Sequence, residues 1–305
     1  MANEQIISQD PPFDPEAILE VRNIRKCFPL KKTITGKVTS ELVAVDNVSF
    51  KLRKGETLGL VGESGCGKTM SAMSILNLIP KTARITSGEI LFNSENLLEK
   101  SQKEMQHIRG SKIALIPQDP MTSLNPLYTV GDQLLEILRF HQNIQGDEAE
   151  KKAIEAFEAV QIPSAKSRLK NYPHEFSGGM KQRAIIAMAL ACNAEILIAD
   201  EPTTALDVTI QAQIMNLLNE IKTNKGTSIL LITHDLALVS ENTDDIAVMY
   251  AGRIVEKAPS KEFFSNPNHP YSKALLKSLP SNRDQKLETI QGQPPTLSQI
   301  IDGCK

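Results

Sequence analysis

The sequence is poor in several features that mark common protein classes. It has no tryptophan and only 4% aromatic residues, and its 34 Lys and Arg residues are balanced by 36 Asp and Glu residues. The resulting net charge of -2 gives no general attraction to nucleic acid or to anionic lipid. Because no local basic patch stands out either, we expect no nucleic-acid partner.

Cysteine is scarce as well. The four cysteines, Cys27, Cys66, Cys192 and Cys304, are scattered along the chain without CxxC spacing. This distribution favours neither a disulfide framework nor a zinc site. We therefore expect reduced thiols.

The sequence also lacks a secretion signal and a long apolar run. Residues 1–10 are mostly polar and acidic, whereas a signal peptide begins with basic residues followed by apolar ones. The longest uninterrupted apolar run, residues 184–192, is much shorter than the roughly 20 residues of a membrane helix. We expect the chain to stay in the cytoplasm and to meet a membrane only through a partner.

The composition that is present, 41% hydrophobic and 23% charged residues, is typical of a folded protein with one sizeable core and a smaller one. Strand and helix patterns alternate, which predicts an α/β fold with a parallel sheet covered on both faces by helices. We expect a loop over residues 31–41. The expected strands are residues 17–24, 42–52, 57–61, 88–92, 112–117, 195–200, 227–233 and 245–250, and the expected helices are residues 67–78, 130–142, 147–160, 209–222 and one that begins at residue 178.

Shifts in pattern divide the chain into three parts. Residues 1–16 are polar and proline-containing, which indicates a flexible leader. Residues 17–258 carry the alternating pattern, and within them residues 119–179 lose the strand signal and form a candidate inserted helical subdomain. Residues 259–305 are studded with proline and form a C-terminal extension.

One motif combines glycines with a lysine and a hydroxyl. It follows a strand that is apolar on both faces and opens a helix, the context in which GxxxxGK(S/T) binds phosphate. Glycines let backbone N–H groups converge on phosphate oxygens at the positive end of the helix. Lys68 is expected to neutralise the β- and γ-phosphates, and Thr69 to offer its hydroxyl to Mg²⁺. The motif consists of Gly62, Glu63, Ser64, Gly65, Cys66, Gly67, Lys68 and Thr69.

A second motif is an apolar strand that ends in two carboxylates, Asp200 and Glu201. Open parallel sheets bind ligands at the carboxyl ends of their strands. We therefore expect Asp200 to hold the magnesium shell and Glu201 to polarise the attacking water. Such a pair can equally be a solvated strand end, but its presence with the phosphate loop in one chain favours catalysis.

The segment Phe176-Ser177-Gly178-Gly179-Met180-Lys181-Gln182-Arg183 resembles the LSGGQ signature of ATP-binding-cassette (ABC) proteins, with Phe for Leu and Met for Gln. Taken alone, it is a helix start with a capping serine. The resemblance implies that Ser177, Gly178 and Gly179 form a second phosphate-binding helix end, which reaches the γ-phosphate bound to the opposite subunit.

Further residues match the family's landmarks in order. Gln118 matches the glutamine that touches Mg²⁺ and water and links to the helical subdomain, and the segment Ala205-Leu206-Asp207 matches the loop that crosses the dimer interface. His234 matches the switch histidine at the γ-phosphate, and Phe28 the aromatic ring that stacks on adenine. Alone, Gln118 and His234 could be ordinary loop residues, and Phe28 a core residue. The implied fold is a P-loop NTPase cassette with a RecA-like parallel core, an antiparallel β subdomain and an inserted helical subdomain.

Other segments are similar to the ATP-binding subunits of oligopeptide, dipeptide and nickel importers, a resemblance that covers nearly the whole chain. The segments Met70-Ser71-Ala72-Met73 and Gly292-Gln293-Pro294-Pro295 favour the D-type subunit. The lysine-bearing loop after Phe28 is more like the F type; we choose D. The other matching segments are Asp119 with residues 120–126, residues 180–183, residues 203–209 and His269-Pro270-Tyr271.

The resemblance implies an ATPase that uses ATP and Mg²⁺ and powers peptide uptake at the cytoplasmic face of the cell (inner) membrane. Its expected partners are a paralogous ATP-binding subunit, with a homodimer as the alternative, two membrane permeases and, indirectly, a solute-binding protein.

Many members carry a cysteine cluster for an iron–sulfur centre, but the given chain has Cys304 alone there, so we expect no such centre. Two other functions stay open: a soluble ABC ATPase of DNA repair or translation, and an importer of nickel or another small solute.

Overall fold

Two β-sheets organise the chain in the computed structural model, which describes residues 13–32, 38–204 and 206–278. One sheet is antiparallel, with the order β2-β1-β4-β5, and the other is mainly parallel, with the order β10-β9-β3-β8-β7-β6. The strands are β1 (Ala17–Lys32), β2 (Val38–Arg53), β3 (Thr57–Val61), β4 (Arg84–Phe92), β5 (Glu95–Asn96), β6 (Ile113–Ile116), β7 (Ile196–Asp200), β8 (Ser228–Thr233), β9 (Asp245–Tyr250) and β10 (Arg253–Pro259).

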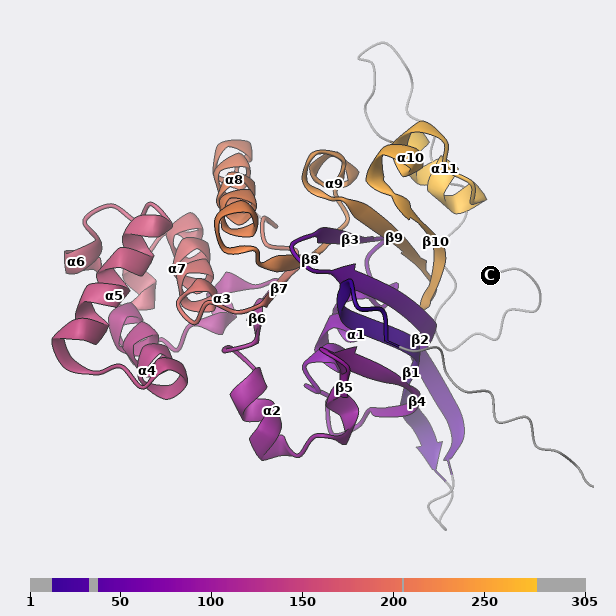
Figure 1. Cartoon of the computed structure of the whole chain (residues 1–305), viewed down its shortest axis with the longest axis horizontal. Coiled ribbons are helices and arrows are strands. Elements are labelled where there is room, and N and C mark those ends of the chain that lie inside the picture. The colour runs from indigo at the N-terminus through magenta and orange to yellow at the C-terminus, as the bar shows by residue number, and fades with distance from the viewer. Residues whose placement is uncertain (1–12, 33–37, 205, 279–305) are drawn as a thin grey trace, which may run out of the picture.

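Helices cover the parallel sheet on both faces and form a separate lobe at one end. Figure 1 shows α8 and α9 on one side of the sheet, α1 on the other, and α3 to α7 gathered at the left. The α-helices are α1 (Lys68–Ile75), α2 (Gln102–Ile108), α3 (Pro120–Ser123), α4 (Val130–Gln142), α5 (Gly146–Ala159), α6 (Ala165–Arg168), α7 (Gly178–Leu190), α8 (Val208–Lys225), α9 (Leu236–Asn242), α10 (Ser260–Ser265) and α11 (Pro270–Lys277). Two short 3₁₀ helices are η1 (Leu97–Glu99) and η2 (Pro173–Glu175).

The parallel strands β3, β6, β7, β8 and β9 form where the sequence predicts them. Every residue of β3, β7 and β8 is buried, as expected of apolar strands covered on both faces. Helix α4 and strand β9 have the predicted limits. The apolar run at residues 184–192 lies largely in α7, where it packs into the core, and no helix within the described ranges is long and apolar enough to cross a membrane.

The expected loop over residues 31–41 is partly wrong. Strands β1 and β2 continue beyond their apolar stretches, so that Pro29 pairs with Glu41, Lys31 with Ser40, and Lys32 with Val38. Cross-strand pairing extends the ribbon although the sequence here carries no apolar strand pattern, because pairing depends on the neighbouring strand as well as on local composition. Residues 33–37 lie outside the described residues.

Several short elements were not predicted. Helix α2 begins at a capping box in which Ser101 and Glu104 exchange hydrogen bonds, a sequence signal that could have identified it. Helix α9 starts directly after the histidine motif, with Asp235 as its cap. Strand β10 and helices α10 and α11 lie at or near the start of the proline-studded extension.

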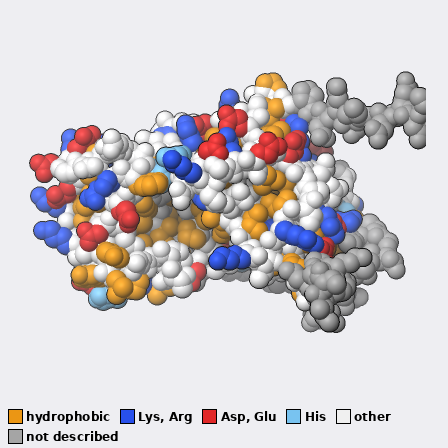
Figure 2. Space-filling view, turned by 90° about the horizontal axis from the view of Figure 1, so that it is seen from below, with side chains coloured by type: hydrophobic (Ala, Val, Ile, Leu, Met, Phe, Trp, Pro, Cys, Tyr) orange, Lys and Arg blue, Asp and Glu red, His pale blue; other side chains and the backbone are white. Residues whose placement is uncertain are grey.

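Hydrophobic clusters link the sheets to the helical lobe. One joins the antiparallel sheet, α1 and the parallel strands. Another runs from β6, β7 and β8 into α4, α5 and α7, where the rings of Phe157 and Phe176 meet edge to face with centroids 6.5 Å apart. Seen from below, the surface carries hydrophobic side chains in a depression between the lobe, at the left, and the rest of the molecule (Figure 2).

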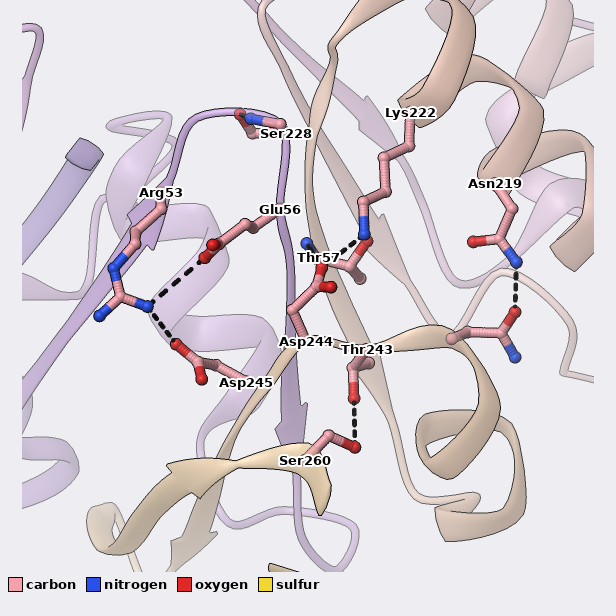
Figure 3. A network of polar contacts seen from close by, with 12 residues as sticks. Arg53, Glu56, Thr57, Asn219, Lys222, Ser228, Thr243, Asp244, Asp245 and Ser260 are labelled. Atoms are coloured by element: carbon pink, nitrogen blue, oxygen red, sulfur yellow. Dashed lines mark hydrogen bonds and ion pairs between the residues drawn. The ribbon is translucent and has the colours of Figure 1, made fainter. Parts of the chain in front are cut away.

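A polar network fixes the amino ends of β3, β8 and β9 (Figure 3). The Asp244 carboxylate accepts the Thr57 N–H at 2.7 Å and pairs with Lys222 of α8, and Arg53 Nη1 lies 2.9 Å from Asp245 Oδ2. These contacts align β9 with β3, so that the carboxyl ends of both strands lie at the same edge of the sheet. The network also includes Glu56, Asn219 with Asn242, Ser228, and Thr243 with Ser260.

A lysine lies entirely inside the fold. Lys26 of β1 is fully buried, and its Nζ donates to the Met70 carbonyl at 3.4 Å. Burial lowers the pKa of Lys26 from 10.5 to about 8. Between these pH values the unfolded chain binds one more proton than the folded chain, so this residue makes stability rise with pH over that window.

We therefore expect Lys26→Met to be more stable than the wild type at pH 7, by about 1–3 kcal/mol, since one pKa unit corresponds to about 1.4 kcal/mol. The difference should shrink as pH approaches 10, because the wild-type amine is then neutral in the folded state. Urea unfolding at several pH values measures it. Lys166→Met, at an exposed lysine, is the control, and identical pH profiles for the two variants would contradict the expectation.

Candidate functional site

The phosphate loop joins β3 to α1 and depends on glycine at two close approaches. Gly62 has φ 150°, and a Cβ there would lie 2.1 Å from the Met249 carbonyl oxygen. Gly67 has φ 107°, and a Cβ there would lie 2.5 Å from the Ala44 carbonyl oxygen. Both positions exclude side chains, so the loop lies tightly against β2 and β9.

Lys68 is the first residue of α1 and is almost completely buried. Its Nζ donates to the carbonyl oxygens of Gly62 at 2.8 Å and Glu63 at 3.0 Å. The Lys68 side chain therefore folds back over the phosphate loop. Inside the loop, burial raises the pKa of the Cys66 thiol, which favours the protonated thiol over the thiolate.

The hydroxyl of Thr69 meets the acidic end of β7. Thr69 Oγ1 donates to Asp200 Oδ1 at 3.2 Å. Burial raises the pKa of Asp200, and the Thr69 hydrogen bond only partly offsets that effect. The pair offers hard oxygen atoms beside the phosphate loop. Within the described ranges, no group of three or more His, Cys, Asp or Glu side chains could hold a metal ion.

Glu201 is held by one side chain from its own loop and by two from the loops that follow β6 and β8. Gln118 Nε2 donates to its Oε2 at 2.9 Å, and Thr204 Oγ1 donates to the same oxygen at 3.0 Å. His234 Nδ1 lies 3.3 Å from Oε1. Burial alone would raise the pKa of Glu201, but the contacts with Thr204 and His234 outweigh it and lower the pKa below its ordinary value.

The backbone of Glu201 is also unusual. Its φ is 47°, a left-handed conformation that is uncommon outside glycine, and its N–H donates to the Ile232 carbonyl at 2.8 Å. The chain therefore turns sharply after β7. As a result, the carboxylates of Asp200 and Glu201 reach different partners. Buried Gln182 of α7 donates to the next carbonyl, Pro202, at 2.7 Å and ties this turn to the helical lobe.

A cavity of about 210 Å³ lies over the phosphate loop. Gln118 and Glu201 lie on its wall, so the residues predicted for metal and water chemistry face the predicted phosphate site. The lining consists of Ala44, Ser64, Gly65, Gly67, Lys68, Thr69, Met70, Gln118 and Glu201. Sequence reasoning missed Thr204 and Ala44; Thr204 lies in a segment noted only for its family resemblance, and Ala44 carries no chemical signal.

Other predicted residues lie elsewhere. Ser177 caps α7 by accepting the Met180 N–H at 3.3 Å and is exposed, as is Gly178, whose Cβ position has open space around it. Gly179 is half-buried. None of the three lines the cavity.

Two further predicted residues, Asp207 and Phe28, also lie outside the cavity lining. Exposed Asp207 caps α8 by accepting the Ile210 N–H at 2.9 Å. Phe28 is half-buried in β1, paired with Leu42, and does not line the cavity. Ala205 and Cys304 lie outside the described residues.

Comparison with known proteins agrees with this geometry. Residues 45–204 match the family model described as ABC transporter. The chain belongs to the ABC transporter family. It is thus an ATP-binding cassette with ATPase activity, and the P-loop cassette fold expected from the sequence is confirmed. Residues 255–305 match the model described as oligopeptide/dipeptide transporter, C-terminal region.

Two curated relatives of this ABC protein resemble it over nearly its whole length. The dipeptide transport ATP-binding protein DppD of Bacillus subtilis is 49% identical over 95% of this chain and 85% of the relative. The oligopeptide transport ATP-binding protein OppD of Escherichia coli is 47% identical over 95% of this chain and 84% of the relative. A solved dimeric ATP-binding cassette bound to ADP and Pi has a TM-score of 0.71 at 26% identity, covering 79% of this chain and 98% of that one.

We predict that Gly67→Ala weakens ATP binding by this ABC cassette. The added methyl group would meet the Ala44 carbonyl, and the left-handed backbone adds about 1–2 kcal/mol of strain. Because about 1.4 kcal/mol corresponds to tenfold in affinity, the loss should reach about tenfold or more. Titration with ATP, with thermal unfolding in parallel, measures both effects.

Gly146→Ala is the matched control. Gly146 also has positive φ, 62°, but a Cβ there has open space around it and the residue lies at the start of α5. Equal ATP affinity in the two variants would show that close approach to Ala44 is not required.

Proposed function

We propose that this chain is the ATP-hydrolysing subunit of a peptide importer and that it powers uptake through separate membrane permeases. The observation that carries the catalytic part is the placement of Glu201, held ionised beside the phosphate loop by Gln118, Thr204 and His234. The peptide class is supported by the matching C-terminal region and by the relatives named for dipeptide and oligopeptide transport.

The proposed ATP site uses the residues already described. The N–H groups of residues 62–69 and the positive end of α1 bind the phosphates. Lys68 exchanges its two carbonyl partners for phosphate oxygens. Phe28 is proposed to stack on the adenine. Thr69 and Asp200, with Gln118, offer oxygen ligands that suit Mg²⁺, which supplies charge neutralisation when bound.

Hydrolysis requires a base at the γ-phosphate, and Glu201 is the proposed one. Its lowered pKa keeps it a carboxylate at neutral pH, so it can accept a proton from water as the water oxygen bonds to phosphorus and ADP leaves. Gln118 and His234 orient this carboxylate, and His234, more than half exposed, also remains free to reach the phosphate.

A second cassette is proposed to complete the site. Exposed Ser177 and Gly178, with Gly179, lie at the start of α7 and outside this chain's own cavity lining, so their N–H groups are available to a nucleotide on a facing subunit. Asp207 is proposed to lie at that interface. ATP then shifts the population towards the closed pair, because it contacts both subunits only there. We propose a paralogous mate, with this chain as the D-type subunit, the type to which the relatives OppD and DppD belong by name.

The proposed division of the chain keeps residues 17–258 as the nucleotide-binding domain, with residues 119–179 inserted, and residues 259–305 as the peptide-importer extension. A soluble repair or translation ATPase is not supported, because the extension matches a transporter-specific region. The proposed location is the cytoplasmic face of the cell (inner) membrane, held by the permeases, with a solute-binding protein on the far side.

The segment between β6 and α4 is the proposed contact with the permeases. Gln118 begins this segment, and three large apolar residues that follow it are exposed: Met121 by 60%, Leu127 by 80% and Tyr128 by 57%. Apolar side chains displayed together next to a catalytic glutamine suit a partner helix. Because Gln118 donates to Glu201, a movement of that partner would be transmitted to the Glu201 carboxylate.

We predict that Glu201→Gln lowers ATP turnover by about 100-fold or more while ATP-driven association with the mate persists, since the amide cannot accept the proton. Steady-state phosphate release and size-exclusion chromatography with ATP measure the two properties. Glu195→Gln, at the opposite end of β7, is the control and should behave as wild type. Normal turnover in Glu201→Gln would remove this residue from its role.

We predict that Leu127→Glu abolishes peptide uptake by the assembled transporter but leaves ATP hydrolysis by the isolated subunit unchanged. A charge on the exposed apolar segment would block docking without reaching the cavity. Uptake of a labelled dipeptide into proteoliposomes, beside phosphate release, separates the two effects. Phe140→Glu, at an exposed apolar residue in the last turn of α4, is the control, and equal uptake by both variants would contradict the assignment.

A further inference from the structure

The phosphate loop has a hydrogen-bond partner in the C-terminal part of the chain. The N–H of Glu63 donates to the hydroxyl oxygen of Tyr271 at 3.2 Å, across 208 positions of sequence. Tyr271 lies in α11, beyond the stretch that matches the ABC transporter model and inside the stretch that matches the oligopeptide/dipeptide C-terminal region. The transporter-specific segment therefore contacts the nucleotide-binding loop directly.

Tyr271 is fixed by packing. Only 8% of the residue is exposed, and its ring lies 4.5 Å from that of Tyr250, centroid to centroid. It belongs to a hydrophobic cluster with Val61, which precedes the first glycine of the loop, and with Leu236, which follows the switch histidine by two positions. Tyr271 thus shares one hydrophobic cluster with residues next to the phosphate loop and next to the switch histidine.

The start of α11 is held by a buried carboxylate. Glu256 of β10 accepts the N–H groups of Asn268 at 2.7 Å and His269 at 3.0 Å. Burial alone would raise the pKa of Glu256, but these donors hold it below its ordinary value. His269 Nδ1 in turn accepts the Tyr271 N–H at 3.1 Å and caps the helix. These contacts fix the start of α11, and packing fixes the Tyr271 ring, so the Tyr271 hydroxyl has a defined position.

We propose that Tyr271 is a positioning residue for the phosphate loop, through which the C-terminal segment sets the affinity of the cassette for its nucleoside triphosphate. This inference rests on the proposed function, in which that loop binds ATP. The bond fixes the second residue of the loop, while Gly62 is fixed against Met249 on the neighbouring side. A loop ordered before binding loses less conformational entropy when the phosphates arrive.

The test is Tyr271→Phe in the full-length chain, which removes one oxygen atom and keeps the ring. We expect the Kd for MgATP and the KM for hydrolysis to rise about 3- to 10-fold, as for one lost hydrogen bond, with kcat within about twofold. Isothermal titration, phosphate release and thermal unfolding are measured side by side. A merely structural role would lower the melting temperature without this separation of KM from kcat.

Tyr250→Phe is the matched control, since it makes the same chemical change in the same cluster and, among the described residues, its hydroxyl has no hydrogen bond to the loop. Equal affinities for the wild type and Tyr271→Phe would overturn the inference. So would an equal loss in Tyr250→Phe, or a loss matched by a larger fall in melting temperature than the control shows. If the wild type itself fails to bind MgATP, the proposed function falls instead.

Discussion

The position of one carboxylate, that of Glu201, depends on the whole parallel sheet. Its partners Gln118 and His234 follow β6 and β8, and the carboxylate itself follows β7, so the three side chains meet only because these strands end at the same edge. The polar network at the opposite ends of β3, β8 and β9 helps to keep the strands level. A slip of one strand would separate the base from the groups that keep it ionised.

The phosphate loop depends on the same edge in a different way. It is closed in on one side by the carbonyls of Ala44 and Met249, and on another by the Tyr271 hydroxyl, so little of its geometry is left to the loop itself. Lys68 Nζ is bound by two carbonyl oxygens of the loop itself, which phosphate oxygens would replace in the proposed ATP site.

Sequence reasoning found the parts of this site that local pattern encodes. Buried strands such as β3 and β7 are apolar runs closed by glycine or by acids, and Asp200, Glu201 and the phosphate loop are visible for that reason. It failed where structure depends on distant partners. The continued pairing of Lys31 with Ser40 has no local signal, and neither has the bond between Glu63 and Tyr271. Thr204 was missed because a lone threonine shows its role only when a carboxylate lies 3.0 Å away.

The position of a bound triphosphate tests the account most directly. In a crystal or cryo-electron-microscopy structure with a non-hydrolysable ATP analogue and Mg²⁺, we expect the γ-phosphate to face Glu201 and His234. Lys68 Nζ should then have left the carbonyls of Gly62 and Glu63 for phosphate oxygens. A triphosphate bound elsewhere, with Lys68 still joined to both carbonyls, would contradict it.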